Sequence, residues 1–295
     1  MLLFLARQVF ARHPMVDLRI LRKPRFLGSS GTMAVTMFVL TGSLFVLTQQ
    51  FQLVLGYSPL LAGAAILPVA GALMACSPLA AALSEAVGVK AAVTCGLLVL
   101  AAGYGSLALF TEGNGYLGMV PGLVLIGAGM GLAQPLVNDV LMSAGPAEQS
   151  GLLSSMNDTV QELGAALGVA VIGSVLATRY GSAYPAAAPP AGRGSLEQAL
   201  SAARDLPADT AHAAVRAAGS AFGQAFSAST AICAGVAVVG AVATAVLLPG
   251  KAAAREAQAA RPDGPPRPVL GDSGAGASGG RGGRGGGGGA LGWGG

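Results

Sequence analysis

The sequence predicts an all-α fold, a membrane protein built as a bundle of six transmembrane helices. Hydrophobic residues make up 53% of its 295 residues and charged residues only 10%, whereas soluble domains carry about 25% charged residues. A helix needs roughly 20 apolar residues to cross the hydrocarbon core of a bilayer. Stretches of that length occur at approximately 26–50, 58–83, 90–110, 116–143, 151–177 and 224–249.

Basic residues gather in the two segments that flank these stretches. Residues 1–25 predict a lead-in that ends a preceding helix, and residues 251–295 predict a Gly/Arg-rich tail, disordered at 274–295. Positive charge favours the cytoplasmic side, and six spans return the chain to its starting side, so both termini of this multi-pass cell-membrane protein are predicted to be cytoplasmic. Lipid head groups explain the net charge of +4 better than nucleic acid does. We expect the lipid bilayer as a partner, and no nucleic acid.

Polar groups mark the ends of the first three stretches. Gln49 and Gln50 end the first stretch, where their amides could line the mouth of a pathway or lie at the head-group level. A short cytoplasmic connection joins the second and third stretches, and its Gly88 permits a tight turn. Glu85 and Lys90 in this connection could brace neighbouring helices by charge pairing or by interaction with helix-end dipoles, or could be solvated.

Glycine spacing in the fourth and fifth stretches predicts close helix packing. Four glycines form two pairs at i, i+4, which leave one helix face without side chains: Gly127, Gly131, Gly164 and Gly168. Pro135 predicts a kink in the fourth stretch. Between the fifth and sixth stretches we expect an outward loop, about 180–223, with short amphipathic helices in its middle.

Three acidic residues lie at membrane depth, where each carries a cost of a few kcal/mol and is a functional candidate. Asp158 and Glu162 are four residues apart and share one face of the fifth helix with Gln161 beside them, and this face cannot contact lipid. Glu162 lies roughly 17 Å into its span, near the midplane. Because lost hydration favours an uncharged carboxyl, Glu162 could load and release a proton or attract a lipophilic cation. Asp139, near the cytoplasmic end of its helix, could serve coupling, gating or packing.

The alternative is that these carboxylates only tie helices together. Asn157 and Asn138 offer amides for such hydrogen bonds, and they could equally line the substrate pathway. The sequence has no pattern typical of a metal site, a cofactor site or a catalytic nucleophile, so we expect no cofactor and no enzyme. Its three cysteines lie inside apolar stretches, where buried and unpaired thiols are expected: Cys76, Cys95 and Cys233.

Three segments together are specific for a known family. Residues 16–26, 52–63 and 157–168 resemble the second half of 14-span drug:proton antiporters of the major facilitator superfamily. The resemblance implies a bundle equivalent to one half of such a transporter, and proton-coupled efflux of hydrophobic or cationic drugs as in multidrug and antibiotic resistance. Residues 82–90 resemble a degenerate cytoplasmic loop motif of the family, with Glu85, Gly88 and Lys90 at its acidic, glycine and basic positions. Ala86 stands where a basic residue is usual.

The resemblance covers only the last six helices of such a transporter, from about residue 10 to residue 248. Half of a pseudo-symmetric cavity cannot alternate between two sides by itself. The chain is therefore expected to be a fragment of a longer product, to pair with a separate N-terminal half, or to associate with itself. A non-transporting membrane subunit or remnant is the alternative function.

Overall fold

The computed structural model describes residues 24–110, 115–142, 150–186, 188 and 190–247. All of these residues belong to one compact unit. The predicted tail and nearly all of the predicted lead-in lie outside the described residues, and they stay predictions.

The described part of the chain contains helices and no strand. The helices are α3 (Pro24–Gln49), α4 (Pro59–Ala64), α5 (Leu67–Val87), α6 (Val89–Phe110), α7 (Gly115–Met142), α8 (Ser150–Ala183), α9 (Leu196–Ala203) and α10 (Ala208–Leu247). A π-helix, Gln50–Val54, continues α3, and a 3-10 turn, Pro190–Gly192, precedes α9. Six helical segments, with α4 and α5 taken as one, are long and apolar enough to cross a membrane. The predicted fold class is confirmed.

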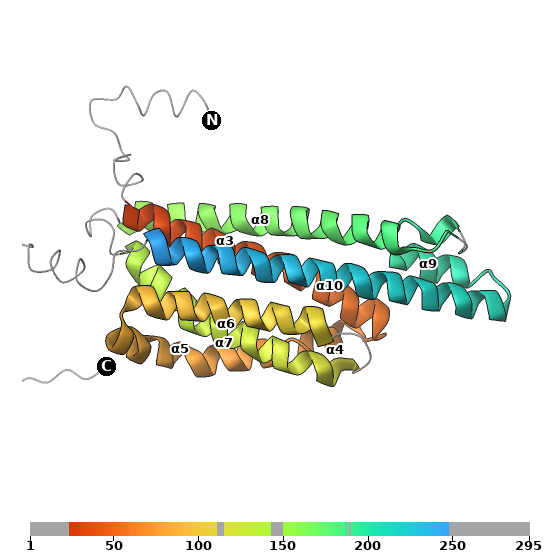
Figure 1. Ribbon diagram of the computed structural model, residues 1–295, viewed down its shortest axis with the longest axis horizontal. Coiled ribbons are helices and arrows are strands. Elements are labelled where there is room, and N and C mark those ends of the chain that lie inside the picture. The colour runs from red at the N-terminus through yellow and green to blue at the C-terminus, as the bar shows by residue number, and fades with distance from the viewer. Residues whose placement is uncertain (1–23, 111–114, 143–149, 187, 189, 248–295) are drawn as a thin grey trace, which may run out of the picture. The chain divides into compact units, whose positions relative to one another are not determined.

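The long helices lie side by side (Figure 1). α7 packs between α5 and α6, α3 packs along α8, and α10 contacts α3, α6 and α8. We call the end that holds α9 the α9 end, and the end that holds the turn between α5 and α6 the Gly88 end. The charge distribution of the sequence predicts that the α9 end faces outward.

The glycine pair of α7 packs against α5. A Cβ built at Gly131 would lie 2.6 Å from the carbonyl oxygen of Leu73, and one at Gly127 would overlap the carbonyl of Val69. Ordinary van der Waals contact begins at 3.4 Å. The two backbones therefore approach as closely as they do only because these positions carry no side chain, as the spacing predicted.

The glycine pair of α8 packs against α3 in the same manner. A Cβ at Gly164 would lie 2.5 Å from the carbonyl oxygen of Ala34, and one at Gly168 would overlap the carbonyl of Phe38. Gly42 of α3 faces Gly168 in return, where an added Cβ would lie 2.8 Å from the Gly168 carbonyl oxygen. Backbone therefore meets backbone along this seam, and the position of α8 relative to α3 is fixed tightly.

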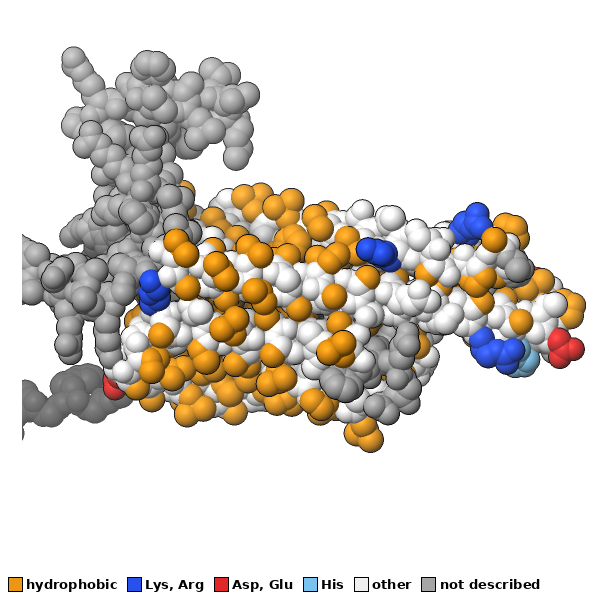
Figure 2. Space-filling model, in the orientation of Figure 1, with side chains coloured by type: hydrophobic (Ala, Val, Ile, Leu, Met, Phe, Trp, Pro, Cys, Tyr) orange, Lys and Arg blue, Asp and Glu red, His pale blue; other side chains and the backbone are white. Residues whose placement is uncertain are grey.

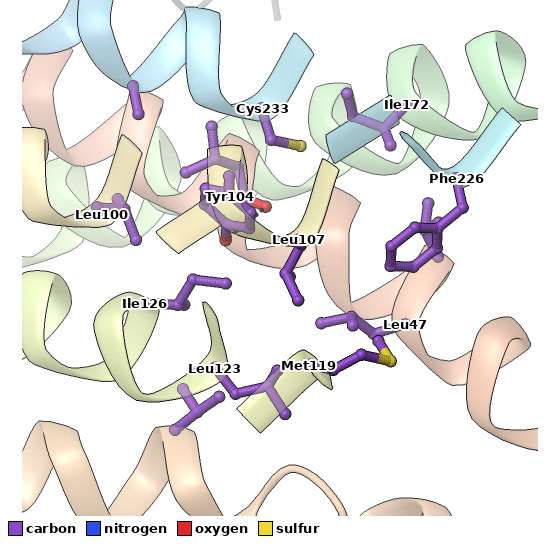
Figure 3. Packing of buried hydrophobic residues seen from close by; sticks show 14 of the residues in the cluster. Leu47, Leu100, Tyr104, Leu107, Met119, Leu123, Ile126, Ile172, Phe226 and Cys233 are labelled. Carbon is purple, nitrogen blue, oxygen red and sulfur yellow. Dashed lines mark hydrogen bonds between the residues drawn. The ribbon is translucent and has the colours of Figure 1, made fainter. Parts of the chain in front are cut away.

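Tyr104 of α6 lies in the middle of the buried core. Its side chain is fully buried, its hydroxyl donates to the carbonyl of Val39 at 3.2 Å, and it forms a hydrogen bond with Ser43 Oγ at 2.9 Å. Figure 3 shows Tyr104 between Cys233 of α10 and Ile126 of α7. Both hydrogen bonds join α6 to α3, so the phenol oxygen is satisfied inside an otherwise apolar core.

The flank of the bundle is apolar, as a lipid-facing surface requires. In Figure 2 hydrophobic side chains spread along the visible flank, and most charged side chains gather toward its ends. Several large exposed side chains come from α5, α6 and α10: Met74, Leu79, Leu109, Val239, Val242 and Val246. Cys95 of α6 is also exposed and Cys76 half-buried, so the expected burial of all three thiols is wrong except at Cys233, although all three are unpaired.

The loop expected at about 180–223 is much shorter than predicted. α8 continues to Ala183 and α10 already begins at Ala208. The reason is composition, because residues 208–223 are rich in alanine, the strongest helix former, and Ala214, Ala218 and Phe222 are buried. The expected short amphipathic helix is present as α9, which buries its apolar side.

Candidate functional site

The two predicted coupling carboxylates lie on α8, inside the candidate span Leu153–Ala183. At 1.5 Å per residue, Asp158 lies about 12 Å and Glu162 about 18 Å from the first residue of the helix, Ser150. Both side chains are exposed, and Gln161 between them is half-buried. The structure therefore brings the pair together on one flank of the bundle, as the spacing predicted.

This flank is opposite to the glycine seam. Gly164 follows Glu162 by two residues, which is about 200° around an α-helix. One side of α8 is thus fixed against α3 by Gly164 and Gly168, and the other side presents the carboxylates. An ionised carboxylate against lipid tails costs a few kcal/mol or more. Within a membrane, this flank can only face a water-filled cavity or another protein surface.

Two amides of the predicted pathway bond to each other. Asn157 Nδ2 donates to Asn138 Oδ1 at 3.4 Å and so links α8 to α7. Asn157 is 6% exposed, and its Oδ1 has no partner among the described residues. Within the described chain, no hydrogen bond or ion pair joins this amide pair to Asp158 or Glu162. The tie between helices that the alternative foresaw therefore exists, but the amides form it without the carboxylates.

Asp139 directly follows Asn138 on α7 and is close to the last residue of this helix, Met142, at the Gly88 end. Its side chain is exposed. The structure thus agrees with its predicted position near one end of its helix, and the coupling role stays a prediction.

The two glutamines at the end of α3 have different surroundings. Gln50 begins the π-helix, is 5% exposed, and its Oε1 has no partner among the described residues. Gln49 is half-buried and lines a cavity of about 120 Å³. Tyr180 and Phe222 line the same cavity but were not predicted as site residues, because no local pattern shows that α8 and α10 meet α3 there.

The turn between α5 and α6 is as tight as Gly88 allows. Gly88 has φ +93° and donates its N–H to the Ser84 carbonyl at 2.9 Å. Glu85 lies in the last turn of α5 and Lys90 in the first turn of α6. A carboxylate at a helix C-terminus and an ammonium at an N-terminus both oppose the helix dipole. Neither side chain is therefore stabilised by the dipole of its own helix, and bracing of the neighbouring helix, by charge pairing or by its helix-end dipole, stays a prediction.

Comparison with known proteins gives the family. The family model described as Major Facilitator Superfamily matches residues 5–169, more than half of the chain. This chain belongs to the major facilitator superfamily. Among the described residues no group of His, Cys, Asp and Glu could hold a metal ion. The match to the Major Facilitator Superfamily model points to a transport protein and not to an enzyme.

Relatives of this superfamily member are named for drug efflux or resistance. It is 31% identical to the multidrug efflux pump LfrA of Mycolicibacterium smegmatis over 56% of this chain and 33% of the relative. It is 33% identical to the multidrug resistance protein Stp of Mycobacterium tuberculosis, over 52% of this chain and 29% of the relative. It is 31% identical to the methyl viologen resistance protein SmvA of Salmonella typhimurium, over 56% and 33%. The matching part thus spans about a third of each relative.

Proposed function

We propose that this superfamily member takes part in proton-coupled efflux of hydrophobic or cationic drugs across the cell membrane, with both termini in the cytoplasm. The observation that carries the proposal is the pair Asp158 and Glu162, exposed one turn apart within a membrane span. Relatives named as a multidrug efflux pump and a methyl viologen resistance protein support the substrate class. In this role the chain would contribute to antibiotic resistance.

Coupling follows from competition for the same carboxylates. A cationic drug is stabilised next to ionised Glu162 and loses that partner when the carboxyl takes up a proton. Alternating binding of proton and drug therefore drives the two in opposite directions, provided that the flank opens to one side at a time. Asp158, one turn away, extends the negative field along the route, and Gln161 adds an amide. Asp139, which lies nearer the Gly88 end, acts in gating at that end of the pathway.

In this proposal a second six-helix unit completes the transport pathway beside the carboxylate flank. The carboxylate flank of α8 needs a polar or protein surface opposite to it, and the match spans about a third of the relatives. An N-terminal half, on the same longer chain or on a separate one, is one candidate for this unit, and a second copy of this chain is the other. Glu85, Gly88 and Lys90 then form the loop that contacts this unit at the Gly88 end.

The test is uptake of ethidium, a fluorescent lipophilic cation, into inverted membrane vesicles that contain the full chain, with and without a proton gradient; in inverted vesicles such uptake corresponds to export from the cell. We expect gradient-dependent transport that Glu162→Gln abolishes, because glutamine keeps the size but cannot exchange a proton. Glu197→Gln is the matched control, since Glu197 lies on α9, outside the candidate spans, and is exposed. Normal transport by Glu162→Gln would remove this residue from the mechanism.

A non-transporting membrane subunit is the second candidate, and the Asn157–Asn138 bond favours it because this bond links α8 to α7 without the carboxylates. Vesicles distinguish the two functions. If the inserted wild-type chain shows no gradient-dependent export, either alone or with an N-terminal half supplied on a second chain, the subunit role stands and the transport proposal fails.

A further inference from the structure

The cavity at the α9 end has the construction of a small ligand site. It has a volume of about 120 Å³, and Phe45 and Gln49 of α3, Tyr180 of α8 and Phe222 of α10 contribute to its wall. Residues 194–196, which lead into α9, close one side. Cavities of about 150 Å³ with apolar walls accept one benzene ring. This cavity is somewhat smaller but open on one side, so it can take a single aromatic ring and nothing larger.

The covering segment is held firmly over the helix ends. The Tyr180 hydroxyl donates to the carbonyl of Gly192 at 3.0 Å, and Ser195 Oγ accepts from the N–H of Gln198 at 3.2 Å as the N-cap of α9. Leu196 and Ala199 of α9 are buried. The cover is therefore a packed part of the bundle, and the cavity is a property of the fold and not of a loose loop.

The wall indicates the chemistry of the ligand. Three aromatic side chains offer ring contacts, which favour another ring by offset or edge-to-face packing: Phe45, Tyr180 and Phe222. None of the described residues that line the cavity is charged. A charged ligand would lose hydration there without a compensating partner. The amide of Gln49 has no hydrogen-bond partner among the described residues and can bind one polar substituent.

The cavity lies farther along the line on α8 that carries the carboxylates, at a level where this side of α8 faces Phe45 of α3. Gly173, which lines it, follows Glu162 by eleven residues, so it lies about 16 Å farther along the helix and only about 20° around it. Ala166 and Ala170, between the two positions, are small and exposed. A molecule that moves along this flank from Glu162 toward the α9 end meets the cavity where the flank passes beneath residues 194–196.

We propose that this cavity binds neutral one-ring aromatic compounds with a single hydrogen-bonding group, of which phenol is the simplest, with the ring among Phe45, Tyr180 and Phe222 and the polar group on Gln49. The site extends the proposed function, since it would receive the aromatic end of a compound that leaves the carboxylate flank. Binding itself needs no proton coupling, so the two proposals can be tested separately.

The test is binding of 4-fluorophenol to the full chain in lipid nanodiscs, followed by fluorine NMR line broadening against empty nanodiscs. We expect saturable binding that Ala177→Leu weakens at least tenfold, because Ala177 lines the cavity and the added carbons fill it. Thr178→Leu, the control, places the same leucine side chain at a neighbouring exposed position that does not line the cavity. Gln49→Leu should weaken binding about fivefold through loss of one hydrogen bond.

Three results would overturn the site: no broadening above that of empty nanodiscs, equal binding by Ala177→Leu and Thr178→Leu, or competition by phenyltrimethylammonium as strong as that by unlabelled phenol. Glu162→Gln should bind 4-fluorophenol like the wild type. Loss of export in that variant with intact phenol binding supports both proposals. Export unaffected by Glu162→Gln would end the coupling proposal and leave the cavity proposal standing.

Discussion

Replacing Gly164 with alanine tests the seam that holds α8 in place. The added Cβ would lie 2.5 Å from the carbonyl oxygen of Ala34, and ordinary contact begins at 3.4 Å, so α3 and α8 must separate locally by about 0.9 Å. Overpacking of this kind costs about 1–3 kcal/mol, and alanine in place of glycine returns about 0.5–1 kcal/mol of helix propensity. We expect Gly164→Ala to lower the free energy of unfolding by about 1–2 kcal/mol.

The measurement is equilibrium unfolding of the full chain by SDS in mixed micelles, followed by circular dichroism. Gly31→Ala is the control, because Gly31 lies in α3 with no atom within 4 Å of the position of an added Cβ. That variant gains propensity without a clash and should be more stable than the wild type by about 0.5–1 kcal/mol. Equal unfolding of the two variants would refute the argument that backbone contact determines the position of α8.

Three further changes test other parts of the bundle by the same unfolding measurement. Gly88→Ala forces a side chain to φ +93° and should cost about 1–2 kcal/mol, whereas Gly71→Ala, at an open helical position, should not destabilise. Thr32→Val and Thr244→Val remove the 2.7 Å bond between α3 and α10, and a double-mutant cycle should give a coupling of about 0.6 kcal/mol; zero coupling contradicts this. Tyr104→Phe deletes two core hydrogen bonds and should cost about 1 kcal/mol, and unchanged stability would show that they contribute nothing.

The helices and their close contacts could be predicted because local sequence determines them. In a membrane, length and apolar composition specify a spanning helix, since backbone groups must be satisfied within the segment. A glycine pair at i, i+4 marks a bare face whatever the partner is. Gly127 and Gly164 therefore showed that α7 and α8 make close contacts, although their partners, α5 and α3, became known only from the fold.

Features that depend on tertiary contacts could not be predicted. The extension of α10 back to Ala208 was missed because hydropathy marks the apolar centre of a helix, whereas alanine-rich ends are helical without being strongly apolar. The cavity at the α9 end needs Gln49, Tyr180 and Phe222 from three helices. Sequence spacing predicted that Asp158 and Glu162 share one face of α8. It could not predict that α3 packs against the opposite face, because this contact depends on the tertiary fold.

The proposed function needs an accessible side of α8, whereas the contact with α3 needs a closely packed side. The sequence of α8 places these two sides at different angles around the helix. Gly164 and Gly168 meet carbonyl groups of α3, so this side tolerates no added atom without movement. On the carboxylate flank Ala166 and Ala170 are exposed and small, which lets a partner unit approach closely and cover Glu162. In the proposed mechanism, movement of the partner toward α8 would cover Glu162, and the closely packed α3 side would keep this residue in register while the partner moves.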